Sequence, residues 1–458
     1  MNNDTMLNRR ARAMQQSRDQ IKSEVLSQNV ALNEEELAVK HNSMARIVDL
    51  GSHFLNKVDL TEAEKEQFRN MIKRVVQEES YRAFGRDGFE SQIRVEKVVM
   101  DLIFGLGPLQ KYMEDPDISD IIVASTKDHG IIVTVEKNGV TQDVDVTFEN
   151  EGELRMLIDR IVQQCGRTIN IVNPMVDASL ADGSRVNACI RPVAVDGPCL
   201  AVRKFREIAI KGEDYLRLGS MTPNMLKFLS LCVKARVNIL VSGGTGSGKT
   251  TMLNLLSGYI PENDQIVTIE DTPELQLQQL HVRRKTVRLS NNQSTKNVDQ
   301  KALVRNALRE RPDRIILGEI RDESIVDMLS AMSTGHEGSM CTVHADNVDI
   351  LFGTRIPTMF PSNEFSERQV SMMVAGAIQV VVQIRRFPDG ARRVTEIAVV
   401  DGIGSEKEGN PVITKTLYGY DNKNKRFYCT GIRPEALIEY ALWRDVELPD
   451  ELFREESS

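Results

Sequence analysis

The first apolar pattern along the chain is helical and covers residues 43–106. Apolar side chains recur there at the three- and four-residue spacing of one helix face, for example at Phe68, Ile72 and Val75. The preceding residues 1–42 are polar and charged and contain few aromatic side chains, a composition typical of segments that cannot form a packed core. We therefore expect a disordered or loosely helical extension over 1–42 and a helical layer over 43–106.

The pattern changes over residues 107–212, where short runs typical of β-strands surround one helical run. Asn138 and Gly139 lie between two of these runs and form a two-residue hairpin signal. The segment is predicted to be a small α+β domain with a helix over 154–165. Its expected strands cover residues 118–124, 130–136, 144–148, 186–190 and 199–205.

From residue 213 to residue 458 apolar strand-like runs alternate with helical segments. Such alternation predicts an α/β domain in which helices cross over between the strands of a largely parallel sheet. The expected strands of this domain cover residues 238–242, 265–269, 314–318, 338–343, 379–384 and 394–400.

The composition is that of a protein with real hydrophobic cores: 41% of its 458 residues are hydrophobic, and its formal charge is −8. The six cysteines include no C-x-x-C pair, which favours a reduced, cytoplasmic compartment. Crossing a bilayer takes roughly 20 apolar residues. The longest candidate, residues 374–384, is shorter and contains two glutamines, and the first residues lack a signal-peptide core. We therefore expect any link to a membrane to run through partner proteins.

A glycine-rich loop follows the strand expected over residues 238–242. Its sequence fits G-x-x-x-x-G-K-[ST], the phosphate-binding P-loop, in the required order of strand, loop and helix. Glycines let the backbone N–H groups wrap a phosphate, the lysine reaches the β- and γ-phosphates, and the threonine hydroxyl binds Mg²⁺. The chain is therefore predicted to bind ATP and Mg²⁺, the latter through Thr250. The expected nucleotide-binding residues are Gly243, Gly244, Thr245, Gly246, Ser247, Gly248, Lys249, Thr250 and Thr251.

A second nucleotide-site strand is expected over residues 314–318, because this apolar run ends in an acid, Glu319. Ligands of α/β sheets bind at the carboxyl ends of the strands, so Glu319 is our candidate for the general base that orients the attacking water. Gly318 stands where a metal-supporting Asp is common in P-loop enzymes. The alternative role for Glu319 is a surface ion pair with Arg321.

Two more clusters add candidate site residues. Glu270 and Glu274 belong to a short loop with three acids that ends another expected strand and could hold hydrated Mg²⁺ or position water. His336 and His344 bracket the strand expected over 338–343 and could sense the γ-phosphate or link subunits. The alternatives are a solvated acidic turn and hydrogen-bonded structural histidines.

Positive charge is also needed to stabilise a transferring phosphoryl group. The candidate arginines lie in both predicted domains, and each could equally be a solvated surface residue. They are Arg185, Arg191, Arg203, Arg305, Arg309 and Arg321.

These motifs together resemble the secretion-ATPase superfamily of type II and type IV secretion and of type IV pili. The matching segments are Gly243–Thr251, Ile269–Glu274, Arg311–Arg321 and Thr334–Ala345, which look like the Walker A, Asp, Walker B and His boxes. The resemblance implies a RecA-like ATPase domain over 213–458, in which Gly-Glu is a typical ending of Walker B.

The closer resemblance is to the tight-adherence (Tad or Flp) pilus ATPases of the CpaF type. It is carried by segments outside the core motifs and spans roughly residues 85–440. The resemblance implies that 107–212 is a PAS-like domain that caps the bound nucleotide, with Arg185 and Arg203 as its best arginine contacts. The supporting segments are Ala181–Asn187, Ala201–Phe205, Leu303–Leu308 and Thr430–Pro434.

The resemblance implies a cytoplasmic homohexameric motor that hydrolyses ATP, sits at the inner membrane through platform proteins and acts on pilin indirectly. Glu319, Arg203, Arg185, Glu274 and His344 are its expected catalytic residues, and Glu270 and His336 complete the expected nucleotide contacts.

Two alternatives stay open: a type IV secretion ATPase that moves protein or DNA, and a nucleotide-dependent regulatory switch without productive turnover. Direct nucleic-acid binding is not expected, because the basic run 283–285 has no aromatic residues beside it for stacking on bases.

Overall fold

The computed structural model describes residues 32–55, 57, 60–146, 148, 150–205, 211–288, 297–362, 364–405 and 411–454. Most of the extension expected over residues 1–42 therefore lies outside the described residues. The chain divides into two compact units, Met1–Phe205 and Arg206–Ser458. This division falls a few residues before the domain boundary expected at 212/213.

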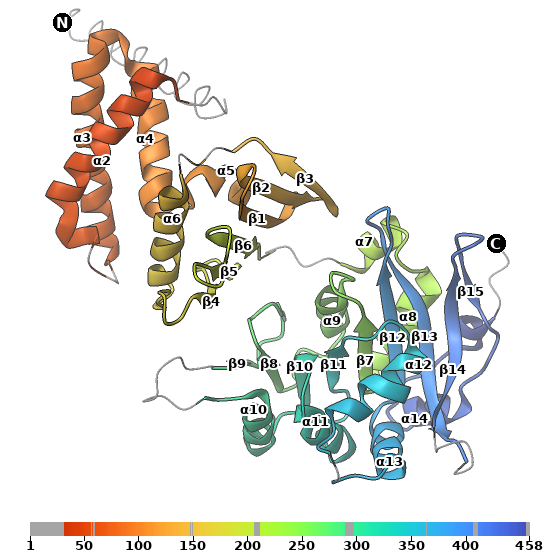
Figure 1. Ribbon diagram of the computed structural model, residues 1–458. Coiled ribbons are helices and arrows are strands. Elements are labelled where there is room, and N and C mark those ends of the chain that lie inside the picture. Colours follow the sequence, from red (N-terminus) through yellow and green to blue (C-terminus); the bar gives the residue numbers. More distant parts are fainter. Residues whose placement is uncertain are drawn as a thin grey trace, which may run out of the picture. The chain divides into compact units, whose positions relative to one another are not determined.

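The N-terminal unit begins with three long helices, α2 (Glu34–Leu55), α3 (Glu62–Phe84) and α4 (Phe89–Phe104), which lie side by side in Figure 1. The apolar stripe seen in the sequence forms their shared core, which includes the fully buried side chains of Ile72 and Val95. Helix α2 begins well before the start expected at residue 43. Short helical turns then lead into the sheet: η1 (Gly85–Asp87), η2 (Gly107–Leu109) and α5 (Gln110–Glu114).

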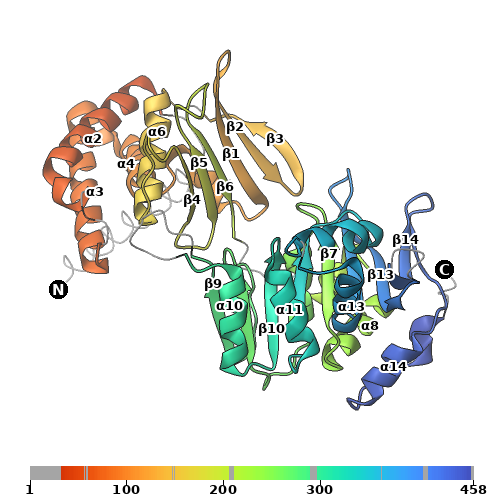
Figure 2. The ribbon, with the colours of Figure 1, turned by 60° about the horizontal axis from the view of Figure 1, so that its bottom comes forward.

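An antiparallel six-stranded sheet forms the second part of this unit, in the order β3-β2-β1-β6-β5-β4. Helix α6 (Glu151–Gln164) buries its apolar face in the same core as the sheet, and Figure 2 shows it lying beside the strands. The strands are β1 (Ile118–Thr126), β2 (Gly130–Lys137), β3 (Val140–Val144), β4 (Met175–Ser179), β5 (Arg185–Cys189) and β6 (Cys199–Arg203).

The strand predicted over 144–148 is wrong, because β3 instead ends at Val144. Asn138 and Gly139 both have positive φ, which makes a tight two-residue turn, and Lys137 pairs directly with Val140. The turn therefore fixes the start of β3 immediately after it. Strand β4 was not predicted, since its side chains at this sheet edge are mostly exposed.

The C-terminal unit contains a nine-stranded sheet in the order β15-β14-β13-β12-β7-β11-β10-β8-β9. Strands β12, β7, β11, β10, β8 and β9 run parallel, and β13, β14 and β15 continue the sheet as an antiparallel extension. The strands are β7 (Ile239–Gly243), β8 (Ile266–Glu270), β9 (Val282–Thr286), β10 (Arg314–Ile320), β11 (Met340–Val343), β12 (Val380–Arg386), β13 (Arg392–Ile403), β14 (Val412–Asp421) and β15 (Arg426–Cys429).

Helices cover both faces of this sheet, as Figure 2 shows with α10, α11 and α13 in front and α8 behind. Alternate residues of β7 enter different cores: Ile239 and Val241 pack on one side, and Leu240 packs on the other. The longer helices are α7 (Gly212–Arg217), α8 (Pro223–Lys234), α9 (Lys249–Ser257), α10 (Gln300–Ala307), α11 (Ser324–Ser333), α13 (Glu367–Ala377) and α14 (Glu435–Leu442). Shorter turns are η3 (Leu308–Glu310), α12 (Val348–Ile350), η4 (Leu351–Arg355), η5 (Pro357–Met359) and η7 (Asp450–Phe453).

The central strands are buried on both faces, which is the rule for parallel sheets with crossover helices. The predicted α/β class, with a RecA-like P-loop domain after a smaller α+β domain and a helical layer, is therefore confirmed. Within the described residues, none of the helices combines the length and the apolar character needed to cross a bilayer.

Candidate functional site

The phosphate-binding loop joins β7 to α9, as the sequence predicts. Gly246 and Gly248 have φ values of 68° and 96°, a backbone region that glycine enters without strain. Gly243 is required for a different reason, because a Cβ there would stand 2.4 Å from the carbonyl oxygen of Ile384 on β12. Together these glycines let the loop curl tightly in front of the first turn of α9, where free N–H groups attract anions.

Lys249 begins α9 and reaches back over the loop. Its Nζ donates to the carbonyl oxygen of Gly244 at 3.0 Å and lies 3.2 Å from Nε2 of His344. Burial lowers the pKa of Lys249 to about 8, although the nearby carboxylate of Glu319 acts in the opposite direction. A buried cation with too little negative charge around it is well suited to receive a phosphate.

Strand β10, which carries Glu319, and strand β11, which leads to His344, end at the same edge of the sheet as β7. β11 lies between β7 and β10 and runs parallel to both, so the residues that follow these strands converge. Nε2 of His344 lies 3.0 Å from Oε1 of Glu319, and Oε2 of Glu319 accepts from Arg321 at 2.5 Å. The contact between His344 and Glu319 lacks hydrogen-bond geometry. Lys249, His344, Glu319 and Arg321 thus form one continuous chain of charged and polar groups.

Opposing influences set the protonation states of Glu319 and His344 in this cluster. Burial alone would raise the pKa of Glu319, but the hydrogen bond and charge of Arg321, with smaller contributions from His344 and Lys249, hold it below its ordinary value. Burial, and then the charge of Lys249, lower the pKa of His344. At neutral pH Glu319 is therefore an ionised proton acceptor beside a neutral imidazole.

Arg321 makes the surface-type ion pair that was the alternative role for Glu319, and the same carboxylate also faces His344 and Lys249. Arg321 lies 3.9 Å from Oδ2 of Asp271 as well, which connects it to the acidic loop after β8. Glu319 can have both roles, because one of its carboxylate oxygens pairs with Arg321 and the other faces His344.

Glu270 ends β8 and is almost fully buried. Its Oε1 accepts from the backbone N–H groups of Glu274 and Leu275 at 2.7 and 2.8 Å. Among the residues that the structure describes, none forms a hydrogen bond to its Oε2, and burial raises the pKa of this carboxyl group. A Cβ on the neighbouring Gly318 would lie 3.1 Å from Cγ of Glu270. The glycine thus leaves room for the Glu270 side chain beside β10, the strand that carries Glu319.

The buried, unpartnered oxygen of Glu270 is the feature that fits a hydrated Mg²⁺ ion, an oxygen-seeking cation that keeps several of its waters. Thr250, the predicted Mg²⁺ ligand, lies in the first turn of α9. Asn254, one turn further along α9, ties the helix to the acidic loop: its Nδ2 donates to the carbonyl oxygen of Glu274 at 3.2 Å, and its Oδ1 accepts from Gln276. These two hydrogen bonds therefore fix the acidic loop after β8 to the helix that follows the P-loop.

Most of the other P-loop residues lie where the sequence predicts. Ser247 donates from Oγ to the carbonyl oxygen of Gly244 at 2.8 Å, so its side chain closes the loop. Thr245 is exposed at the loop tip, and Thr251 is half-buried in the first turn of α9. The side-chain charge of Glu274 acts on both Lys249 and Arg321, which places it close to the cluster.

His336 is not brought to this site. It precedes β11, so it lies at the amino edge of the sheet, opposite the edge where His344 and the P-loop lie. Its Nδ1 is 2.8 Å from the carbonyl oxygen of Pro312, and its own carbonyl accepts from Ser339 Oγ at 2.6 Å. In this structure His336 joins the segments before β10 and β11, which matches the structural alternative from the sequence.

The same amino edge holds a buried polar cluster. The side chain of Asn238 donates to the carbonyl oxygens of Met332 and Ala377 and accepts from the N–H groups of Gly338 and Ser339. Arg314 is fully buried and donates from Nε to Asp264 at 2.7 Å. These bonds fix the starts of the parallel strands.

Arg185 and Arg203 lie in the other unit, directly opposite each other on β5 and β6. Nε of Arg203 donates to Asp120 at 3.0 Å, and about half of the Arg203 side chain is exposed. Arg191 lies on the loop after β5, 3.3 Å from Glu151. The basic run 283–285 forms part of β9, where Lys285 pairs with Glu310.

Two arginines that were not predicted touch the P-loop from the side. Arg392 at the start of β13 donates from Nε to the carbonyl oxygen of Gly246 at 2.9 Å. A Cβ on Gly246 would lie 3.3 Å from Nη1 of Arg386 on β12. The only sequence signal is the pair of basic dipeptides that flank Phe387–Ala391, and their contact with a loop so distant in the chain is not visible in the sequence.

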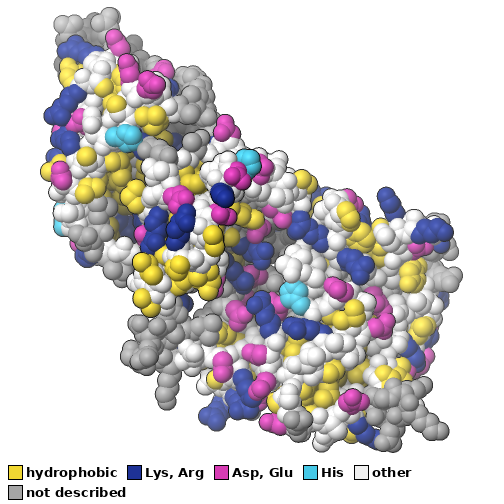
Figure 3. Space-filling view, viewed as in Figure 1, with side chains coloured by type: hydrophobic (Ala, Val, Ile, Leu, Met, Phe, Trp, Pro, Cys, Tyr) yellow, Lys and Arg dark blue, Asp and Glu magenta, His cyan; other side chains and the backbone are white. Residues whose placement is uncertain are grey.

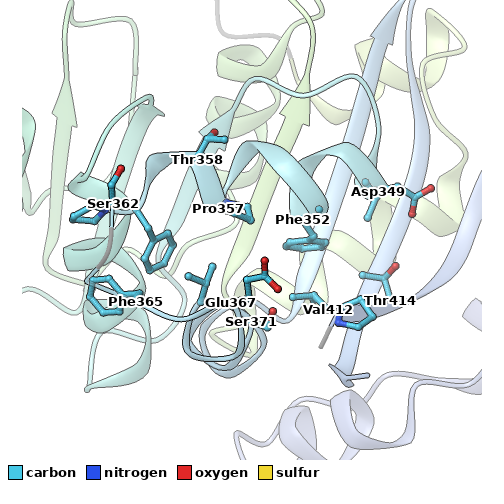
Figure 4. A pocket seen from close by; sticks show the side chains of 16 residues that line it. Asp349, Phe352, Pro357, Thr358, Ser362, Phe365, Glu367, Ser371, Val412 and Thr414 are labelled. Atoms are coloured by element: carbon cyan, nitrogen blue, oxygen red, sulfur yellow. The ribbon is translucent and has the colours of Figure 1, made fainter. Parts of the chain in front are cut away.

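A cavity of about 760 Å³ lies elsewhere in this unit, between the turns η4 and η5, helix α13 and the start of β14 (Figure 4). Phe352, Phe365 and Val412 give it an apolar lining, and Asp349 and Glu367 add acidic groups. None of the P-loop residues lines it, so it is separate from the candidate phosphate site.

A known protein family, several curated proteins and several solved structures are similar to this chain. Residues 104–396 match the model of a family described as type II/IV secretion system protein. A putative conjugal transfer protein of Mycobacterium tuberculosis is 31% identical over 310 residues, which is 66% of this chain and 87% of that protein. The type IV secretion system protein VirB11 of Bartonella quintana is 28% identical over 329 residues, or 64% and 91%. Among solved structures, the pilus retraction motor PilT with bound ADP is similar at 24% identity and a TM-score of 0.45, covering 63% of this chain and 80% of that one.

Proposed function

The chain belongs to the type II/IV secretion system protein family, and we propose that it is a cytoplasmic, Mg²⁺-dependent ATPase motor that works as a homohexamer. In this proposal the motor sits at the inner membrane through platform proteins and powers assembly of a tight-adherence pilus, acting on pilin only indirectly. Retraction of the same filament would use the same site.

The observation that carries the ATPase proposal is the continuous chain Lys249–His344–Glu319–Arg321 beside the P-loop. The loop N–H groups and Lys249 would hold the β- and γ-phosphates, and Thr250 and Glu270 would hold hydrated Mg²⁺. A bound Mg²⁺ would neutralise the phosphate charge that develops during transfer.

Glu319 would take the proton of the attacking water, since it is ionised and faces the space between the strand ends. His344 contacts both Glu319 and Lys249, so it would keep the carboxylate of Glu319 in place beside the phosphate that Lys249 holds. Glu274 and Asp271 would keep Arg321 near the same place. Arg185 and Arg203 would add positive charge from the capping domain, and closure would follow if they bind the γ-phosphate more tightly in the closed state.

The first test is steady-state ATP hydrolysis by purified wild type and Glu319→Gln, with the mass of each determined in the same Mg-ATP buffer. We expect a hexamer whose turnover needs Glu319, falling by about 10²–10⁴-fold in the variant. A wild-type protein that binds ATP but never turns it over, alone or with its membrane partner, would support the regulatory-switch alternative instead.

The tight-adherence assignment rests on the segments Ala181–Asn187, Ala201–Phe205, Leu303–Leu308 and Thr430–Pro434. A second candidate is a type IV secretion or conjugation ATPase that moves protein or DNA. It is favoured by the printed names of the relatives, which include conjugal transfer proteins and VirB11.

Identification of the integral membrane protein that co-purifies with the full chain would separate these two candidates. A pilus platform protein supports the first, and a conjugation or secretion channel component supports the second. Direct binding to nucleic acid is not part of either proposal. On the face shown in Figure 3 acidic and basic side chains are interspersed over the C-terminal unit, and the formal charge of the whole chain is −8.

A further inference from the structure

The hairpin between β12 and β13 lies directly beside the phosphate loop. Ile384 on β12 pairs with Gly243, the first glycine of the loop, so the residues that follow Ile384 run alongside the loop. Arg386 and Arg392 are opposite each other at the turn end of the hairpin, on either side of the loop 387–391. Cross-strand partners point to the same face of a sheet, so both side chains are directed to the same side.

Arg392 touches the loop at two of its glycines. Its Nε–H donates to the carbonyl oxygen of Gly246 at 2.9 Å. Its Cδ lies 3.3 Å from the position that a Cβ on Gly248 would occupy. The arginine therefore packs against the left-handed turn that brings the chain into α9, and its guanidinium holds one peptide unit of that turn.

We infer that Arg392 is a positioning residue of the nucleotide site, which holds the Gly246–Ser247 peptide in the orientation needed for binding phosphate. The inference rests on the proposed function and adds a residue to the same site. Because the peptide unit is planar and trans, its carbonyl and its N–H point in opposite directions. A hydrogen bond that fixes the carbonyl of Gly246 toward the hairpin also fixes the N–H of Ser247 on the other side, where it donates over a long distance of 3.4 Å to the carbonyl oxygen of Gly244.

The position of Arg392 is itself well supported. The N–H of Val394, two residues along β13, donates to the carbonyl oxygen of Ser220 at 2.9 Å. Arg392 also lies close enough to Tyr215 on α7 for its charge to act on that hydroxyl group. The arginine is thus placed between the phosphate loop and the segment that begins the C-terminal unit after residue 210.

Arg393 provides a matched control, because neighbouring residues of a strand point to opposite faces. Its guanidinium lies over the rings of Phe387 and Tyr420, with centroids at 4.9 and 5.5 Å, and it pairs with Asp389 at 3.6 Å. Replacing Arg393 removes the same charge from the same hairpin without touching a loop contact that the structure describes.

The test compares full-length wild type, Arg392→Ala, Arg392→Lys and Arg393→Ala. Affinity for MgADP is measured by calorimetry, and steady-state hydrolysis gives KM and kcat. A charge-assisted hydrogen bond at a partly exposed site predicts that Arg392→Ala raises the Kd for MgADP and the KM for ATP by about five- to tenfold. We expect kcat to stay within about twofold, because the bond acts through the loop on ground-state and transition-state binding alike.

We expect Arg392→Lys, which keeps a charged donor, to recover part of the affinity, and Arg393→Ala to bind as wild type does. Thermal unfolding of the nucleotide-free variants shows whether each is folded. If Arg392→Ala is unfolded, Arg392→Lys alone decides the comparison, with a rise in Kd of about two- to threefold expected from a poorer donor geometry.

Equal Kd values for the folded Arg392 variants, Arg393→Ala and wild type would overturn the inference while leaving the proposed function intact. A loss confined to kcat would also overturn it, since the residue would then act on the chemical step. A wild-type protein that binds no MgADP would instead overturn the proposed function itself, and the inference with it.

Discussion

The two edges of the C-terminal sheet carry similar residues that have opposite roles. At the amino edge, Arg314 is fully buried and its Nε–H is bonded to Asp264, and the side chain of Asn238 makes four hydrogen bonds. At the carboxyl edge, Lys249 is also buried. Burial lowers the pKa of both cations, that of Lys249 to about 8. Arg314 has a carboxylate partner, whereas Nζ of Lys249 contacts the carbonyl oxygen of Gly244 and the ring of His344.

This difference distinguishes a polar cluster that stabilises the fold from one that binds a ligand and takes part in a reaction. Polar groups that hold strands in place have partners for most of their bonds, since an unpaired buried group costs free energy. Groups that await a ligand are left under-compensated, and strongly perturbed pKa values then concentrate there. The carboxyl edge shows the second pattern at Lys249 and Glu270, where burial lowers and raises the pKa respectively.

The two histidines of one short motif show the same contrast. His336 and His344 lie on either side of β11, and a strand of that length separates its ends by roughly 13 Å. The first contacts the carbonyl oxygen of Pro312, whereas the second contacts Glu319 and Lys249. A motif that is continuous in sequence is therefore divided between two edges with different functions.

The largest expected effect comes from removing the buried cation at the carboxyl edge. Lys249→Ala deletes the side chain that meets the phosphates, so nucleotide affinity is expected to fall by at least about 100-fold. Calorimetric titration with MgADP measures the loss. Affinity equal to that of wild type would mean that the P-loop assignment is wrong.

The next largest effect tests the amino edge. Asp264→Ala leaves the guanidinium of Arg314 buried without its carboxylate, and the free energy of unfolding is expected to fall by about 3–5 kcal/mol. Urea unfolding checks this, with Glu262→Ala as the control, since Glu262 is exposed only two residues away. The control is expected to change stability by less than about 0.5 kcal/mol. Equal stability of the two variants would remove the structural role assigned to this cluster.

The histidines allow the most direct contrast between the edges. His344→Ala is expected to lower kcat by about tenfold or more, because it contacts the proposed base. His336→Ala is expected to leave kcat within about twofold and to lower the free energy of unfolding by about 1 kcal/mol through loss of one hydrogen bond. Parallel measurements of turnover and thermal unfolding check both. A large loss of kcat in His336→Ala, with stability unchanged, would reverse the assignment.

The smallest expected effect is the uptake of protons when nucleotide binds, which tests the depressed pKa of Lys249 at the carboxyl edge. With a pKa of about 8 in the nucleotide-free protein, Lys249 is half neutral at pH 8. A bound anion favours the charged form and raises this pKa, so binding of MgADP at pH 8 takes up about half a proton, and affinity falls as the pH rises through 8. Calorimetry in buffers with different ionisation enthalpies measures the uptake. No uptake, or a release of protons, would contradict the depressed pKa.

The sequence predicted those parts of the site that depend on local geometry. The P-loop is recognisable because strand, glycines, lysine and helix lie within one short segment, and Glu319 because it directly follows the apolar run 314–318. Strands β9, β14 and β15 were missed because many of their side chains are exposed or half-buried and their pairing is set by distant parts of the chain.

From the sequence we expected His336 at the nucleotide and did not identify Arg392. For His336 a signal was present, because the strand predicted between the two histidines implies that they lie at opposite edges of the sheet. Arg392 is 146 residues away from Gly246 in the chain, so only the sheet order that places β12 beside β7 reveals their contact.

The central claim is that Glu319 supplies the chemical step at the carboxyl edge while the P-loop binds nucleotide independently of it. The direct measurement incubates Glu319→Gln with Mg-ATP, removes free nucleotide rapidly and identifies what stays bound. The account predicts that the variant retains ATP, whereas wild type retains ADP. Bound ADP in the variant, at a rate of formation close to that of wild type, would contradict the claim and move the base to another carboxylate of the site.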